Sequence, residues 1–423
     1  MVERIIGNAE VGSSILPGGT SGPSIGYDRG ATFQSPLQSL TQDGALFDGR
    51  VAAMRFKSLD SLRGLAALAV VFHHCLLTLP ASARGHGSVA WWMTATPLRL
   101  LVDGPGAVLL FFVLSGFVLA ASIQSGLAKD PVGFDYGRFA AKRFLRIYPP
   151  FALAVFMSAG LYLLVQPQPI AALSGWFNAQ SWAYPVAPAM LAGHLLMTDQ
   201  HRDMSLINVM WSLVHELRIS MIFPLIFFGM RARPALTLMI AAILSAGANL
   251  ALSQGGLSPL VQTLCGTVQY GVMFAAGTLL YLKNQTISIW MAKTGPWASV
   301  AAVILGGYLF FLPRTLPVLS LWATGLAAML YVIAAFGSAT LVKVLSGKAL
   351  TWLGKVSYSL YLLHLPVLLT VFHLFSGKAP LGVLIAATVG LSLIAAQLSY
   401  RWIEKPSMAL GRWAKRPKMA KAA

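Results

Sequence analysis

Ten apolar runs, separated by turn residues and charges, constrain this 423-residue chain more than any other feature. A run of about twenty apolar residues can cross a bilayer as a helix, whereas the strands of a membrane barrel alternate apolar and polar residues. Only 10% of the residues are charged, against about 25% in soluble proteins. The sequence therefore predicts an all-α polytopic membrane protein with about ten transmembrane helices. The runs are 59–80, 104–125, 147–165, 206–229, 235–252, 263–282, 297–312, 318–337, 353–375 and 381–401.

Basic residues gather on one side of this predicted arrangement. The inner segments contain Lys142, Arg143, Arg146, Arg231, Arg233, Lys283, Lys293, Lys343, Lys348, Lys355 and a basic C-terminus, and the outer segments contain only Arg84, Arg99, Arg202, Arg314 and Lys378. Cytoplasmic loops of membrane proteins carry this excess, so both termini are predicted to be cytoplasmic. The net charge of +18 is spread between apolar runs, which argues for membrane lipids and against nucleic acid as a partner.

The two ends of the chain differ from its middle. Residues 1–55 are rich in Gly, Ser, Pro and Gln and lack an apolar stretch of signal-peptide length. We expect a mostly disordered cytoplasmic tail over residues 1–55, a transmembrane domain over 56–406 and a basic cytoplasmic tail over 407–423. The weaker apolar run 187–197 is too short to span and is expected to be re-entrant or interfacial.

The first run carries ionisable residues on one helix face. At about 100° per residue, Arg63 and His74 lie about 20° apart around the axis, whereas His73 points elsewhere. Asp60 is close to the same face. Ionisable side chains are costly in a bilayer, so this face should meet protein or water, and a functional role is favoured over helix packing. Arg63 and His74 are about 16 Å apart along the axis, so we expect them to mark two ends of one channel.

Six sequence phrases occur in order along these runs. They are RGLAALAVVFHH (63–74), FFVLSGFVLA (111–120), RFAAKRFLRIYPPF (138–151), WSLVHELRISMIFPLI (211–226), LGKVSYSLYLLHLPV (353–367) and YRWIEKP (400–406). Together they resemble the integral membrane acyltransferase-3 family, and the resemblance spans residues 59–406. Leu109 departs from the pattern, because many members carry Asp there, and suggests a different polar contact between helices.

The resemblance implies an O-acyltransferase of the bacterial inner membrane. It would move an acetyl or similar short acyl group from cytoplasmic acyl-CoA, the donor substrate, to an extracytoplasmic polysaccharide or glycolipid. His74 would be the catalytic base or a transient acyl acceptor, because imidazole exchanges protons near neutral pH. Arg63 would lie near the donor phosphates, the alternative being that it reaches the inner headgroups. Direct transfer and a two-step route both remain open, as does the acceptor.

Further residues are candidates for the same site. Glu216, in the middle of its run, is interpreted as a partner that orients His74 or the acceptor hydroxyl, the alternative being an ion pair with an Arg of another helix. Arg143 and Arg146 are expected to bind donor phosphates or to act as inner-surface anchors. Four residues are expected either to line the substrate cavity or to pack helices: Ser115, Trp211, Tyr358 and His364.

The sequence also bears on bound cofactors and on a possible transport function. No metal motif, P-loop or dinucleotide fingerprint occurs in a suitable context, so no metal and no bound cofactor are expected.

The alternative function is a transporter or flippase of a glycan or lipid intermediate, in which the intramembrane charges would serve a transport path. The two halves of the chain lack an inverted repeat of charged, broken helices, which disfavours this alternative.

Overall fold

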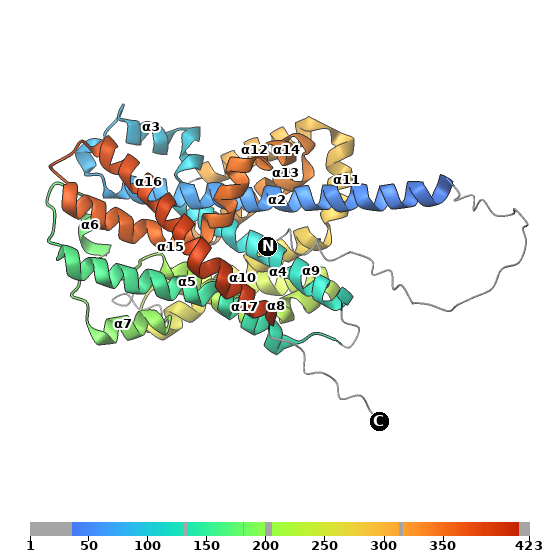
Figure 1. Ribbon diagram of the computed structural model, residues 1–423, viewed down its shortest axis with the longest axis horizontal. Helices are drawn as coiled ribbons and strands as arrows, with labels where there is room; N and C mark the ends of the chain where they lie inside the picture. Colours follow the sequence, from blue (N-terminus) through green and yellow to red (C-terminus); the bar gives the residue numbers. More distant parts are fainter. Residues whose placement is uncertain (1–35, 130–132, 181, 199–204, 313–315, 414–423) are drawn as a thin grey trace, which may run out of the picture.

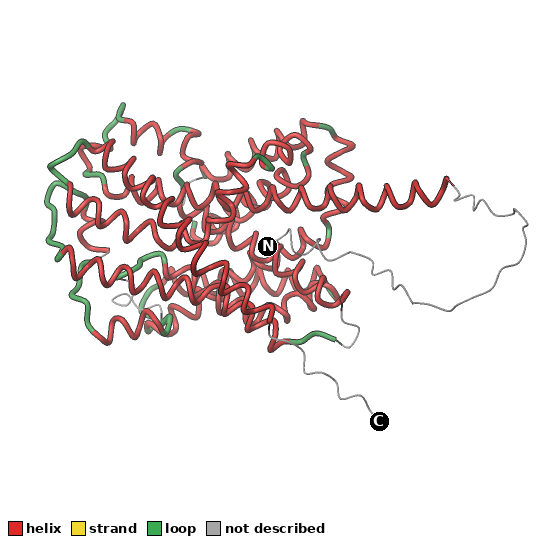
Figure 2. The backbone as a smooth tube through the Cα atoms, in the orientation of Figure 1, coloured by secondary structure: helices red, strands yellow, loops and turns green. Residues whose placement is uncertain are grey.

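The computed structural model describes residues 36–129, 133–180, 182–198, 205–312 and 316–413. These residues form helices joined by loops, with no strand among them (Figure 1, Figure 2). The long helices run side by side along the longest axis of the molecule, and α2 (Pro36–Thr78) projects beyond the others at one end (Figure 1). The all-α polytopic architecture predicted from the sequence is therefore confirmed.

Nine helices of the described chain are long and apolar enough to cross a membrane, and a tenth span results if one bent pair is counted. This agrees with the ten predicted runs. The nine are α2, with its apolar part Phe56–Thr78, α4 (Gly104–Lys129), α5 (Tyr136–Val165), α8 (Met210–Ala232), α9 (Pro234–Gln254), α10 (Pro259–Leu282), α13 (Pro317–Gly337), α15 (Lys348–Phe375) and the unit formed by α16 (Leu381–Ser399), η4 (Tyr400–Glu404) and α17 (Lys405–Trp413).

The seventh predicted run is only part of the bent pair. Helix α11 (Asn284–Thr294) meets α12 (Pro296–Phe311) at an angle of 111°. Gly295 joins them with a φ of 71°, a conformation that favours glycine, and Pro296 begins α12, where its fixed φ suits a first turn. The bend explains why the apolar run 297–312 is shorter than its neighbours.

Short helices fill the connections. Between α2 and α4 lie η1 (Ala81–Arg84), α3 (Val89–Ala95) and η2 (Pro97–Leu101); between α5 and α8 lie α6 (Gly175–Gln180) and α7 (Pro188–Leu195); α14 (Ala339–Leu345) precedes α15. Helix α7 coincides with the weak run 187–197 and has eight residues, too few to span a bilayer.

The ends differ from the predicted boundaries. Helix α2 begins at Pro36, so residues 36–55 are helical where a disordered tail was predicted. No proline interrupts the helix after Pro36, so a helix formed in the membrane can continue outward. At the other end, α17 continues through the predicted boundary at 406. Residues 1–35 and 414–423, and the predicted outer cations Arg202 and Arg314, lie outside the described residues.

Helices α2 and α15 approach each other closely through glycines. A Cβ atom added to Gly64 would lie 2.6 Å from the backbone nitrogen of Gly354, and one added to Gly354 would overlap the carbonyl oxygen of Asp60. Small residues allow such contacts between membrane helices, where apolar burial gives little driving force. The crossing brings the predicted polar face of α2 against α15, and it is this contact that assembles the site.

Candidate active site

Two histidines from these helices form one end of the site. The Nδ1 atom of His74 on α2 lies 3.0 Å from the Nε2 atom of His364 on α15. Each Nδ1 atom also faces the carbonyl oxygen four residues earlier in its own helix, Val70 at 3.0 Å and Leu360 at 3.1 Å. Helical periodicity therefore fixes both rings, and the crossing of α2 and α15 pairs them.

The acceptors around the two rings define their tautomers when both are neutral. The Leu360 carbonyl can only accept, so His364 carries its proton on Nδ1 and presents a lone pair at Nε2. The Nδ1 atom of His74 faces that lone pair and the Val70 carbonyl, so it must be a donor. This leaves the Nε2 atom of His74 without a proton, which is the form that a general base requires.

Trp176, in the short helix α6 that follows α5, packs against His74. Its ring centroid lies 5.3 Å from that of His74. The start of α6 is fixed to the end of α2, because Ser174 donates from its hydroxyl to the Leu77 carbonyl at 2.5 Å and from its backbone to the Thr78 carbonyl at 3.1 Å. Trp176 is therefore held at His74 by the same helix that carries the histidine.

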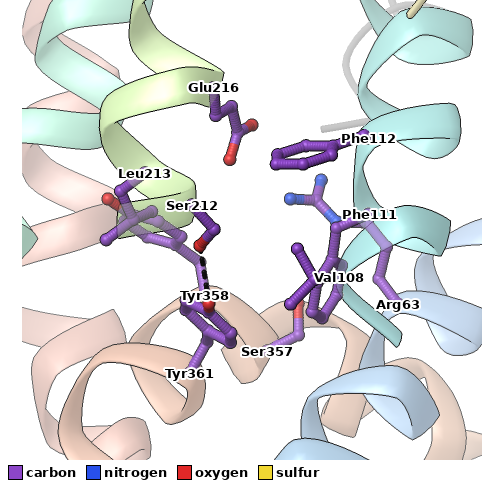
Figure 3. A pocket seen from close by; sticks show the side chains of 10 residues that line it. All are labelled: Arg63, Val108, Phe111, Phe112, Ser212, Leu213, Glu216, Ser357, Tyr358 and Tyr361. Atoms are coloured by element: carbon purple, nitrogen blue, oxygen red, sulfur yellow. Dashed lines mark hydrogen bonds between the residues drawn. The ribbon is translucent and has the colours of Figure 1, made fainter. Parts of the chain in front are cut away.

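A small cavity of about 20 Å³ lies between α2, α4, α8 and α15. Figure 3 shows Arg63 and Glu216 pointing into it from opposite sides, with Phe111, Phe112 and the tyrosines of α15 around them. Tyr361 shares a hydrogen bond of 2.6 Å with Ser212 of α8, and its ring lies 6.1 Å from that of His364. Tyr361 thus connects the wall of the cavity with the histidine pair.

The other end of the site, around Arg63, is rich in charge. Arg63 is attracted electrostatically to Glu216, Asp60 and Glu404, and repelled by Arg146. Arg143 is 5% exposed and belongs to the same electrostatic cluster. The Nε atom of Arg63 and one Nη atom of Arg143 are buried without a hydrogen-bond partner. Unpaired buried guanidinium donors are costly, so these atoms point to an anionic ligand.

Glu216 lies at the cavity and does not contact His74. Its carboxylate accepts a hydrogen bond of 2.9 Å from Ser115 of α4 and faces Arg63 across the cavity. The residue that contacts His74 is His364. The structure therefore contradicts a direct contact between Glu216 and His74, because α8 faces α4 and the cavity, whereas α15 carries the group that reaches the His74 ring. That Glu216 orients the acceptor hydroxyl stays a prediction.

The other predicted residues divide between the cavity and its surroundings. Tyr358 lines the cavity and donates a 2.7 Å hydrogen bond to the Ile147 carbonyl of α5. Arg146 donates a 3.1 Å hydrogen bond to the sulfur of Met408 on α17. Trp211 packs instead against the rings of His215 and Tyr270. It does not line this cavity, so its interpretation as a helix-packing residue is the one that the structure supports.

Glu404 is a member of the charged cluster for which no role was predicted from the sequence. It lies in the YRWIEKP phrase, at the end of an apolar run. Membrane segments rarely carry a carboxylate without a partner, so the position of Glu404 could have identified it as a candidate site residue from the sequence. Among the described residues, no group of three or more His, Cys, Asp or Glu side chains is placed to hold a metal ion.

Comparison with known proteins gives a consistent result. Residues 56–400 match the model of a family described as Acyltransferase domain (Acyl_transf_3). The chain is 25% identical to "Putative peptidoglycan O-acetyltransferase YrhL" of Bacillus subtilis (strain 168) over 82% of its own length and 54% of that protein, so it spans about half of this relative. It is 26% identical to "Acyltransferase MdmB" of Streptomyces mycarofaciens over 84% of its length and 92% of that protein. No solved structure matches significantly.

Proposed function

Because this chain belongs to the acyltransferase family that its residues 56–400 match, we propose that it is an acyltransferase with the following donor, acceptor and mechanism. The donor is acyl-CoA in the cytoplasm, and the acceptor is a hydroxyl of a glycan or glycolipid outside the inner membrane. The acyl group is acetyl or of similar size. A peptidoglycan-like polymer is the favoured acceptor, because one relative is named as a putative peptidoglycan O-acetyltransferase.

The observation that carries the proposal is the His74–His364 pair. The acceptor hydroxyl loses its proton to His74 Nε2 as its oxygen attacks the thioester carbonyl of the donor. The carbon–sulfur bond then breaks, and the proton on Nε2 passes to the CoA thiolate. In a two-step route the same lone pair would instead take the acyl group, and acid-quenched protein would retain radiolabelled acyl on His74.

The donor end of the proposal rests on the arginine cluster. Guanidinium groups bind phosphate oxygens through paired hydrogen bonds, and Arg63 and Arg143 have buried N–H groups without partners. Arg63 and His74 are about 16 Å apart along one helix. The charged head of CoA would stay at the inner end, and its extended pantetheine arm would reach along α2 towards His74, which requires the small cavity to widen when the donor binds.

The proposal is tested by replacing the base and its sequence neighbour. His74→Ala should lower the ester product formed by membranes from acyl-CoA by at least about a hundredfold, since a positioned general base contributes about 10²–10⁴. His73→Ala is the matched control, because His73 bonds the Val102 carbonyl at 3.0 Å on another face of α2. It should retain most of the activity. Equal losses in the two variants, at equal protein levels, would contradict the role of His74.

A further inference from the structure

A buried carboxylate with no role in the proposed reaction lies at the charged end of the site. Glu404 is 2% exposed and ends η4, a turn of π-helix between α16 and α17. Trp402, two residues earlier, is 65% exposed. A π-turn holds one residue more per hydrogen bond than an α-turn and is frequent at functional sites, because it changes the direction of the side chains that follow it.

The Glu404 carboxylate interacts with a serine hydroxyl and with two arginines. Its Oε2 atom accepts a 2.8 Å hydrogen bond from Ser359 of α15, the residue after the cavity-lining Tyr358. The carboxylate is attracted electrostatically to Arg146 and Arg63, in that order of strength. Arg146 in turn contacts Met408 on α17, four residues beyond Glu404, so η4 and the helix that follows it both interact with this arginine.

We propose that Glu404 is a positioning residue of the donor site, a fixed counter-ion that holds Arg146 and Arg63 and competes with the donor phosphates for them. This inference rests on the proposed use of acyl-CoA. Three arginines close together inside a membrane protein repel one another unless an anion compensates them. Glu404 supplies this compensation when the donor is absent.

The same charge has a consequence when CoA is bound. The phosphates of CoA then share Arg146 and Arg63 with a carboxylate that Ser359 keeps in place. Glu404 therefore weakens the binding of both the donor and the free CoA product. Release of product limits the rate of many enzymes, so a counter-ion of this kind keeps turnover from being limited by CoA dissociation.

The experiment measures binding of coenzyme A to the purified full-length protein in lipid nanodiscs by titration calorimetry. Glu404→Gln keeps the shape of the side chain and removes its charge. It should lower the Kd of coenzyme A about 10- to 20-fold, the effect of one charge at roughly 10 Å in a medium of effective dielectric constant about 20. The donor KM of membranes should fall by a similar factor, with no gain in kcat. An unchanged or raised Kd would overturn the inference.

Two further variants separate charge from packing. Glu404→Asp keeps the charge and should not tighten binding, so a lower Kd in both variants would mean a packing effect and would overturn the inference. Ser359→Ala removes the hydroxyl that donates a hydrogen bond to the Glu404 carboxylate. The arginines should then interact with Glu404 more strongly, and the Kd of coenzyme A should rise. This variant decides the matter if Glu404→Gln does not fold, and an unchanged or lower Kd would then count against Glu404. Absence of binding by the wild-type protein would refute the proposed donor itself.

Discussion

His74 and His364 lie on different helices, and each ring is fixed by a carbonyl of its own preceding turn. The acceptor at His364 Nε2 keeps the proton of His74 on Nδ1, so the base function of His74 depends on a second residue. His364→Ala should lower kcat about tenfold or more, part of the 10²–10⁴ contributed by a positioned base. His364→Gln offers an amide oxygen as acceptor and should recover part of that loss. Initial rates in membranes with equal protein content check this, and a glutamine variant no better than alanine would refute the tautomer role.

The elements that decide the site are α2 and α15, which cross where Gly64 meets Gly354. A methyl group at position 354 would overlap the Asp60 carbonyl and push the helices apart, separating Arg63 and His74 from the residues of α15. Gly354→Ala should therefore destabilise the protein by about 1–3 kcal/mol and reduce activity. Gly390→Ala on α16 is the matched control, because its Cβ would meet no atom within 4 Å. Thermal unfolding of both purified variants tests this, and equal melting temperatures would exclude the close crossing.

On the scale of the whole molecule, the basic segments predict that the arginine end faces the cytoplasm and the Trp176 end faces outside. Single cysteines can test this in a background without Cys75 and Cys265. Ala183→Cys lies in the loop between α6 and α7, Ala128→Cys lies near the end of α4, and both positions are exposed. An impermeant thiol reagent added to intact cells should label position 183 and spare position 128. The reverse pattern would invert the orientation and exchange the sides proposed for donor and acceptor.

The sequence by itself determined the class of fold and the polar face of the first span. Membrane spans are local, because a helix satisfies its own backbone and needs only a continuous apolar run of sufficient length. The placement of Arg63 and His74 on one face follows from the helical repeat alone. The phrases along the chain indicated the acyltransferase family, which the match over residues 56–400 shows.

Only the tertiary structure decided which helices meet that face. Periodicity within α8 and α15 could not tell that Glu216 bonds Ser115 while His364 reaches His74, because both pairings join residues that are far apart in sequence. The π-turn that buries Glu404 and the bend at Gly295 also interrupt the regular repeat on which sequence reasoning depends. Contacts between membrane helices depend on small residues that let two backbones approach, so the partner of each polar group is set by packing across the whole bundle.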